Sequence, residues 1–341
     1  MYSQIVMYRG NVLTVDPHSR AVSALTGVLP ATVTVARRTD GAIDLNGTRC
    51  VLEWMGDGRL SEARGLLTRP SLPDVVAARR MSPGARAELS DAGVGWVDES
   101  GTAEIVFGTI VVSRSRASDP ARPIPTGWTP SALATAEALL CGIQPTTSAV
   151  VDATGLSFGA CVKALRLLTD LGLLAAEAAR GRRSGRRLED PDRLLSEYSD
   201  AARRLAPPLR VQVAVTWRDV IDGTAEFAAR LAQEGIAYAV TGVVASALLA
   251  PVLTNVSTSE VYVAGTTIVD LESIARTAGL RPIDGGRLTL RPFPSVTTDR
   301  LAATTEDMRV APWPRVYSDL LGAGVRGEDA AEHLKEIIRG R

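Results

Sequence analysis

The sequence predicts an α/β protein of several domains, and three observations lead to that fold class. Strand-like runs rich in β-branched residues alternate with helical patterns in both the first and the last third of the chain. A helical segment separates these two α/β parts, and proline-rich breaks at 118–130 and at Pro207-Pro208 bound that segment. Because 341 residues exceed what one hydrophobic core usually contains, we expect domains at 1–120, 128–206 and 208–341.

The charge balance restricts where a nucleic acid could bind. The chain has 38 basic and 38 acidic residues, so its formal net charge is zero and a DNA-binding surface must be a local patch. Lysine occurs only at Lys163 and Lys335, so nearly every basic residue is an arginine. Only a clustering of arginines is therefore informative.

Metal sites and membrane segments are not expected. The cysteines Cys50, Cys141 and Cys161 have no short metal-ligand spacing, and histidine occurs only at His18 and His333. No apolar run reaches membrane-spanning length, and the first residues lack the apolar core of a signal peptide. The expected location is the cytoplasm, with reduced thiols.

The N-terminal part is expected to form a mixed α/β domain. Its helix signal is "SPGARAELSDAG" (82–93), in which Ser82 is the N-cap, Pro83 takes the first helical position and Gly93 ends the helix. The strand-like runs are "ATVTVAR" (31–37), "RCVLEWMG" (49–56), "PDVVAAR" (73–79), "VGWVDES" (94–100) and "AEIVFGTIVVSR" (103–114).

The middle part predicts three helices. They cover "SALATAEALLC" (131–141), "TTSAVVDATG" (146–155) and a third helix that Ser157 caps. The apolar stripe expected on the third helix comprises Phe158, Cys161, Val162, Leu165 and Leu168.

The segment that follows the third helix predicts a basic hairpin. "LGLLAAEAARGRRSGRRLEDP" (171–191) fits a strand, a glycine-containing basic turn and a return strand. Residues 163–187 contain seven basic and two acidic side chains, a local balance of +5. Three helices followed by a basic hairpin are typical of a winged helix-turn-helix, which binds double-stranded DNA.

The expected DNA-binding residues follow from this pattern. Small residues at the start of the third helix allow it to enter a major groove, and arginines at a hairpin tip reach phosphates or the minor groove. The predicted set is Thr146, Thr147, Ser157, Gly159, Ala160, Lys163, Arg166, Arg180, Arg182, Arg183, Arg186 and Arg187. Two alternatives stay open: a helical hairpin with a solvated basic loop, and a module that binds a partner protein.

The C-terminal part alternates strands and helices again. Strands are expected in "LRVQVAVTW", "IAYAVT" and "SEVYVA", and helices in "TAEFAARLAQEG", "GVVASALLA", "VDLESIARTAG", "PRVYSDLLGAG" and "GEDAAEHLKEIIRG".

Residues 130–341 resemble the AbiEi-type antitoxins and related regulators. The resemblance rests on the winged helix followed by "LRVQVAVTW", "AYAVTGVVASALLAP", "VYVAG" and the closing "APWPRVYSDLLGAGVRGEDAAEHLKE". It implies a DNA-binding autorepressor that need not contact its toxin. It also implies a C-terminal domain similar to nucleotidyltransferases. Where such enzymes hold magnesium with paired carboxylates, this chain has only Glu260, followed by Val261 and Tyr262.

The N-terminal part is somewhat similar to a restriction-endonuclease core, whose metal site needs an Asp and a Glu-x-Lys motif. The candidate acids are Glu53, Asp74, Asp98 and Glu104, but no lysine precedes Lys163. We therefore expect a transcriptional regulator, a repressor, with no catalytic residue, metal or cofactor. The alternative is a magnesium-dependent nuclease or nucleotidyltransferase guided by the winged helix. Whether two copies form a homodimer on a palindromic site is left open.

Overall fold

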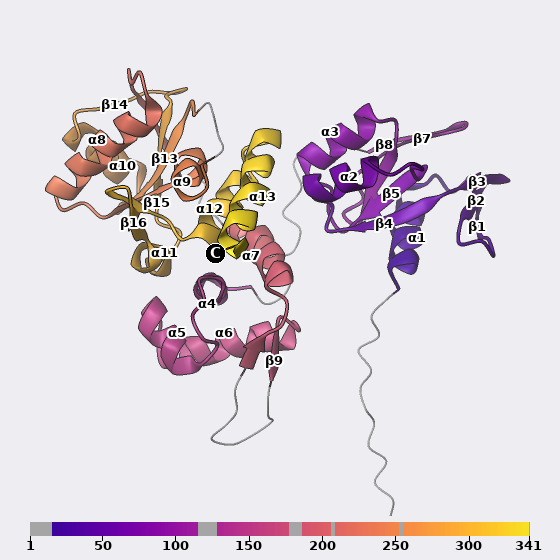
Figure 1. Ribbon diagram of the computed structural model, residues 1–341, viewed down its shortest axis with the longest axis horizontal. Helices are drawn as coiled ribbons and strands as arrows, with labels where there is room; N and C mark the ends of the chain where they lie inside the picture. The colour runs from indigo at the N-terminus through magenta and orange to yellow at the C-terminus, as the bar shows by residue number, and fades with distance from the viewer. Residues whose placement is uncertain (1–15, 115–127, 177–185, 206–208, 252–255, 341) are drawn as a thin grey trace, which may run out of the picture. The chain divides into compact units, whose positions relative to one another are not determined.

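The computed structural model describes residues 16–114, 128–176, 186–205, 209–251 and 256–340 (Figure 1). Within these ranges the chain forms 13 helices and four sheets, which confirms the mixed α/β class. The chain divides into two compact units, Met1–Asp119 and Pro120–Arg341. No single helix in the described ranges is long and apolar enough to cross a membrane. The helices α5 (Thr147–Thr154) and α6 (Phe158–Asp170) reach that length and composition only together, across a bend of 117°.

The first unit is built on a five-stranded sheet of order β4-β5-β6-β7-β8. Neighbouring strands are parallel from β4 to β6 and antiparallel from β6 to β8. The strands are β4 (Leu52–Gly56), β5 (Val75–Ala78), β6 (Gly95–Asp98), β7 (Ala103–Phe107) and β8 (Ile110–Arg114). A separate antiparallel sheet contains β1 (Val35–Arg37), β2 (Ile43–Leu45) and β3 (Thr48–Cys50).

Strand β5 is apolar throughout because helices cover both faces of its sheet. Val75 and Ala77 belong to the core beneath α1 (Pro17–Val28), while Val76 and Ala78 belong to the core beneath α2 (Leu60–Leu67) and α3 (Pro83–Asp91). Successive side chains of a strand point to opposite faces, so burial on both sides requires an unbroken apolar run. The Ser82 hydroxyl accepts a hydrogen bond from the Ala85 amide at 3.2 Å, as its predicted N-cap role requires. Helices α1 and α2 are not among the predicted elements.

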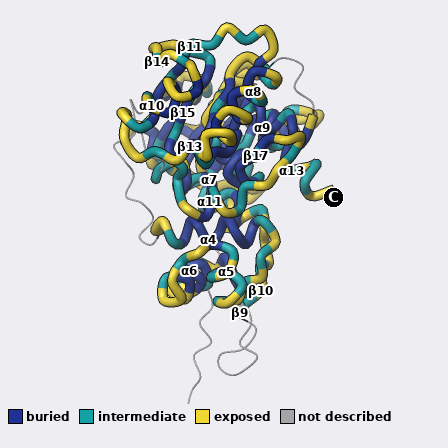
Figure 2. Tube along the Cα trace, turned by 90° about the vertical axis from the view of Figure 1, so that its left-hand side faces the viewer, coloured by how far each residue is buried: buried dark blue, intermediate teal, exposed yellow. Residues whose placement is uncertain are grey.

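The first part of the second unit is mainly helical and forms one end of it, which we call the helical end. Figure 2 shows α5, α6 and the hairpin β9–β10 at one end of this unit, with α4 between them and the sheet. The elements are α4 (Pro130–Leu140), α5 (Thr147–Thr154), α6 (Phe158–Asp170), β9 (Leu174–Ala176), β10 (Arg186–Leu188) and α7 (Pro191–Leu205). Helix α4 is buried on all sides from Ala132 to Leu140, so it is a central helix rather than a surface one.

A seven-stranded mixed sheet forms the rest of the second unit, in the order β14-β11-β15-β13-β12-β17-β16. Its strands are β11 (Val211–Ala214), β12 (Tyr238–Thr241), β13 (Ser259–Val263), β14 (Arg281–Pro282), β15 (Leu288–Pro292), β16 (Ala303–Thr305) and β17 (Met308–Val310). The helices that accompany it are α8 (Val220–Gln233), α9 (Gly242–Leu249), α10 (Ile268–Thr277), α11 (Val296–Leu301), α12 (Trp313–Leu320) and α13 (Val325–Gly340).

The two faces of this sheet differ along β13. The Ser259 hydroxyl accepts a hydrogen bond from Thr224 of α8 at 2.9 Å on one face. Tyr262 lies on the other face, because side chains alternate along a strand, and its hydroxyl donates to Asp319 of α12 at 2.7 Å. Glu260 shares the face of Tyr262, so this face of the sheet carries polar side chains beneath α12.

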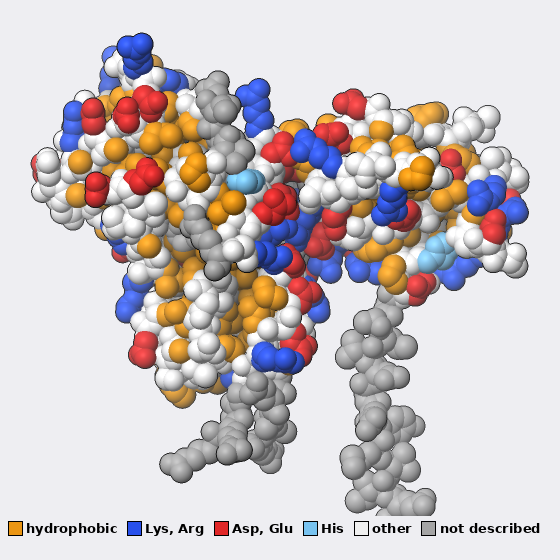
Figure 3. Space-filling view, viewed as in Figure 1, with side chains coloured by type: hydrophobic (Ala, Val, Ile, Leu, Met, Phe, Trp, Pro, Cys, Tyr) orange, Lys and Arg blue, Asp and Glu red, His pale blue; other side chains and the backbone are white. Residues whose placement is uncertain are grey.

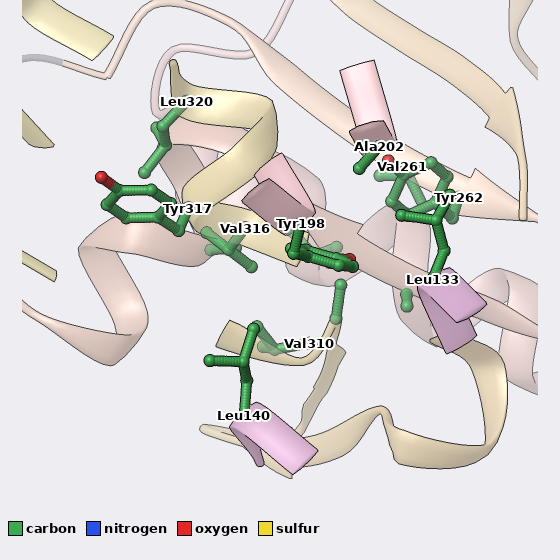
Figure 4. Close-up of a cluster of buried hydrophobic side chains, with 14 of the residues drawn as sticks. Leu133, Leu140, Tyr198, Ala202, Val261, Tyr262, Val310, Val316, Tyr317 and Leu320 are labelled. Carbon is green, nitrogen blue, oxygen red and sulfur yellow. The ribbon is translucent and has the colours of Figure 1, made fainter. Parts of the chain in front are cut away.

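One hydrophobic core joins the helical end to the sheet. Figure 4 shows side chains from α4, α7, β13, β17 and α12 converging in it. Leu133 and Leu140 come from α4, Tyr198 and Ala202 from α7, Val261 and Tyr262 from β13, Val310 from β17, and Val316, Tyr317 and Leu320 from α12. The break expected near residue 207 therefore lies between two parts of one core.

A buried ion pair lies inside this core. The side chains of Arg315 on α12 and Glu137 on α4 are 4% and 1% exposed, and Arg315 Nε lies 3.5 Å from Glu137 Oε2. The hydroxyl of Tyr198 on α7 donates to the same carboxylate oxygen, and the Arg315 guanidinium lies 5.5 Å from the centre of the Tyr198 ring. Burial raises the pKa of Tyr198 well above its usual value, so the phenol stays a donor.

Removing one member of this pair should destabilise the protein more than replacing both. We expect Glu137→Leu to lower the free energy of unfolding by about 3–5 kcal/mol, because it leaves the Arg315 charge buried without a counter-ion. The double variant Glu137→Leu/Arg315→Met should lose clearly less, because both buried charges are gone. Urea denaturation of the three proteins measures this difference, and a double variant as unstable as the single one would contradict it.

Candidate nucleic-acid interface

Helices α5 and α6 are joined by the short turn 155–157. The Thr146 hydroxyl caps α5, and Gly155, with φ of +71°, ends it in the left-handed conformation that favours glycine. The Ser157 hydroxyl then accepts a hydrogen bond from the Ala160 amide at 3.3 Å and starts α6. The chain bends by 117° between the two helices, within the range of about 90–120° found for helix-turn-helix pairs.

The turn is held in place by helix α11, which the sequence analysis did not predict. Thr297 Oγ1 donates to the Thr154 carbonyl at 3.2 Å, and Arg300 Nη2 donates to the Asp152 carbonyl at 3.2 Å. These bonds satisfy carbonyls at the carboxyl end of α5 that lack partners within the helix. A Cβ atom on Gly155 would lie 2.3 Å from Arg300 Nη1, so the end of this flexible side chain would have to move if the glycine were replaced.

The predicted apolar stripe of α6 is wrong at two positions. Cys161, Leu165 and Leu168 are buried, together with Ala164, but Phe158 is 67% exposed and Val162 is 37% exposed. Val162 lies about 100° around the helix from Cys161 and thus beside the stripe. Phe158 lies at the solvent-exposed start of the helix, between the exposed residues Ser157 and Gly159.

The predicted DNA-binding residues of α5 and α6 lie at the surface. Ser157, Gly159, Ala160 and Lys163 line one hollow of about 610 Å³. Arg166 is exposed on the same helix, with its Nε 3.8 Å from Asp170 Oδ2, while Thr146 is exposed and Thr147 half-buried at the start of α5. Arg166, Thr146 and Thr147 are not part of the hollow.

Four further residues line this hollow and were not predicted, and two of them, Ala164 and Leu167, belong to α6. Thr129 and Ser131 at the start of α4 line it opposite the small residues of α6. Thr129 is the N-cap of α4, and its hydroxyl accepts from the Ala132 amide at 3.2 Å. The cap pattern was visible in the sequence, but its position beside α6 depends on how α4 packs against α6.

The hairpin contributes two of its five predicted arginines to the described structure. Strands β9 and β10 are antiparallel, with Arg186 opposite Ala176 and Arg187 opposite Ala175. Arg187 is exposed, and its Nη2 donates to Glu189 Oε1 at 2.9 Å, while Arg186 is half-buried. Arg180, Arg182 and Arg183 lie outside the described residues.

The four candidate nuclease acids of the first unit each have a local partner. Glu53 pairs with Arg69 at 2.6 Å, Asp74 accepts from the Val51 amide at 2.7 Å, and Glu104 accepts from Ser90 at 2.9 Å. Asp98 is fully buried and accepts from the Met81 and Thr102 amides at 3.2 Å each. Asp74 precedes β5 whereas Asp98 ends the parallel strand β6, so these two lie at opposite ends of the sheet.

Acidic and basic side chains are interspersed on the visible face of this unit (Figure 3).

Glu260 has a second carboxylate beside it, which the sequence analysis missed. Arg291 Nη1 lies 3.2 Å from Glu260 Oε2 and 3.4 Å from Asp319 Oδ1, so one guanidinium joins both. Asp319 also accepts from Thr241 Oγ1 at 2.6 Å. Burial raises the pKa of Glu260, the charge of Asp319 raises it further, and Arg291 opposes both. In the part of the chain described, no group of three or more His, Cys, Asp or Glu side chains is arranged to hold a metal ion.

No family model, no curated protein and no solved structure matches this chain. The resemblance to AbiEi-type antitoxins therefore stays a prediction, and we infer function from the residues and their geometry.

Two glycines of the helix pair should respond in opposite ways to alanine. Gly155→Ala should lower the free energy of unfolding by about 1–2 kcal/mol, because alanine resists the left-handed conformation and the end of the Arg300 side chain would have to move. Gly159→Ala should raise it by about 0.5–1 kcal/mol, because Gly159 is helical and has open space around it. Denaturation curves of both variants test this, and equal effects would show that the turn is not fixed as described.

Proposed function

We propose that this protein is a cytoplasmic, sequence-specific regulator of transcription that binds double-stranded DNA through a winged helix-turn-helix, α4–α6 with the hairpin β9–β10. The observation that carries the proposal is the bend of 117° across the turn 155–157, followed by an α6 surface of small and basic residues. A helix of this kind, placed second in such a pair, is the one that enters the major groove.

Each part of α6 has a role in this proposal. Ser157, Gly159 and Ala160 are small, so the start of the helix can approach base edges closely. Lys163 and Arg166 follow one and two turns later, where they reach guanine or phosphate. The exposed Phe158 and Val162, which do not belong to the core, suit apolar contact with thymine methyl groups.

The remaining predicted residues would position the protein on the DNA backbone. Thr146 and Thr147 lie at the start of α5, where backbone amides and hydroxyls suit a phosphate. Arg186 and Arg187 lie on β10 of the hairpin that follows α6. In the proposal, this basic surface also includes Arg180, Arg182 and Arg183. We assign the hairpin to phosphate or minor-groove contact.

The sheet of the second unit is, in this proposal, an inactive nucleotidyltransferase-like scaffold, and the protein acts as an antitoxin-type repressor of its own gene. The arrangement at Glu260 supports this assignment, because the two carboxylates there are joined by the Arg291 guanidinium. In a two-metal site the carboxylates coordinate the metal ions, whereas here they pair with an arginine. The partners of the acids in the first unit likewise support a structural role for them.

The α6 surface can be tested with a matched pair of arginines. Arg166 and Arg276 are both exposed helical residues that lie beside an acidic residue one turn away, but Arg276 belongs to α10. We expect Arg166→Ala and Lys163→Ala to weaken binding to the DNA upstream of the protein's own gene by about 1–3 kcal/mol for a base contact. Arg276→Ala should bind like the wild type.

The measurement is a titration of that DNA and of a random duplex across a salt series. A phosphate contact would reduce the salt slope by about 0.9 and weaken both duplexes equally, whereas a base contact weakens the specific duplex more. If Arg166→Ala and Arg276→Ala behave alike on both duplexes, α6 does not bind DNA.

The enzymatic alternative predicts turnover that the proposal excludes. We expect the protein with magnesium neither to nick plasmid DNA nor to consume nucleoside triphosphates. Glu260→Gln and Asp98→Asn should leave DNA affinity unchanged, with Asp98→Asn checked for folding because Asp98 is buried. Turnover that disappears in either variant would replace the regulator with a DNA-directed enzyme.

A further inference from the structure

The second unit contains a polar pocket between α7, the sheet and α12. Its volume is about 550 Å³, within the range of about 300–1,000 Å³ for small-molecule sites. Its charged lining residues are Arg203, Arg210, Arg291 and Arg315 against Glu260 and Asp319. Four guanidinium groups and two carboxylates therefore line the pocket.

The carboxylates are already occupied by groups of the protein itself. Asp319 accepts from Thr241 and Tyr262 at 2.6 and 2.7 Å, and Arg291 pairs with both Asp319 and Glu260. Arg203 pairs with Asp200 at 2.6 Å. Arg315 has Glu137 as its counter-ion, so of the two remaining arginines only Arg210 is not part of an ion pair within the described ranges.

Arg315 is the unusual one of these two. Its side chain is 4% exposed, yet its Nε has no hydrogen-bond acceptor in the described structure. The nearest carboxylate oxygen, Glu137 Oε2, is 3.5 Å away and already accepts from the Tyr198 hydroxyl. Because Nε faces Glu137, an anion in the pocket would instead form hydrogen bonds with the terminal Nη groups of this guanidinium. Arg210, in contrast, is exposed and makes no hydrogen bond or ion pair within the described ranges, although its charge acts to lower the pKa of Glu260.

The planar guanidinium binds carboxylates and phosphates through paired hydrogen bonds. We propose that this pocket binds a small molecule carrying a phosphate or carboxylate group, held by Arg315 and Arg210, and that Arg315 transmits its binding to helix α4. Neither the DNA-binding surface nor the resemblance assigns such a site.

The second half of this inference follows from the position of Arg315. On the side away from the ligand it faces Glu137 of α4, and the start of α4 lines the hollow beside α6. An anion in the pocket would compete with Glu137 for the guanidinium and so change the packing of α4. This step rests on the proposed DNA-binding function, whereas binding of the anion does not.

Anion binding is tested by calorimetric titration of the full chain with pyrophosphate and with citrate, at constant ionic strength. We expect at least one of them to bind with a dissociation constant of about 1 mM or lower, and the better one identifies the group recognised. Arg210→Gln should weaken the binding of this anion about tenfold, because one hydrogen bond to a charged group is lost. Arg276→Gln, an exposed arginine outside the pocket, should have no effect.

Arg315→Lys should abolish binding of the anion, because lysine keeps the positive charge but cannot form the paired hydrogen bonds of a guanidinium. Because Arg315→Lys alters a buried side chain, it could fail to fold. In that case Arg210→Gln alone tests whether the pocket binds the anion. No binding of either anion up to about 10 mM, or equal effects of Arg210→Gln and Arg276→Gln, would overturn the site.

The coupling is tested by titrating the DNA upstream of the gene with and without the anion that binds. We expect the affinity for DNA to change by about fivefold or more. DNA binding that is insensitive to a bound anion would overturn the link through Arg315. Absence of DNA binding together with anion binding would instead contradict the proposed function and leave the pocket standing.

Discussion

The second unit depends on two charges removed from water between helices that are far apart in sequence. Glu137 of α4 and Arg315 of α12 face each other with Tyr198 of α7 beside them, and all three side chains are buried. Such a pair contributes little net stability, because removing both ions from water costs nearly as much as their attraction returns. The pair instead fixes the alignment of α4 relative to α12, since a shift of either helix would leave a charge without its partner.

Several hydrogen bonds extend this connection to the end of the unit that carries α5 and α6. Trp313 Nε1 donates to the Leu140 carbonyl at the carboxyl end of α4, and Ser318 Oγ donates to the Ser199 carbonyl of α7. Thr297 and Arg300 of α11 hold the end of α5. The helices that would contact DNA are therefore positioned by the sheet and its helices rather than by each other alone. This arrangement makes a distant pocket relevant to their geometry.

Local signals in the sequence predicted many of the elements, but not the strands β14, β15, β16 and β17. Ser82 and Ser157 are N-caps, Gly155 ends α5, and the runs of 75–78 and 259–263 are strands, because each depends on neighbouring residues only. Features that depend on distant contacts were missed. Phe158 fits the helical period but is not covered by the described residues, and Asp319 meets Glu260 through Arg291 only because α12 packs on the sheet. Helix α7 and α11 were likewise not predicted, although α7 supplies Tyr198.

The complete burial of α4 has a consequence for the order of events during biosynthesis. Residues Ala132–Leu140 leave the ribosome well before α11 and α12, which supply part of their covering. The helices α5 and α6 alone do not cover a helix that is buried on every side, so the N-terminal part of this unit stays partly exposed until α11 and α12 have been synthesised. In the proposed function, competence to bind DNA would then arise only after α11 and α12 have left the ribosome, and a chain that stops before them would not compete for the same site.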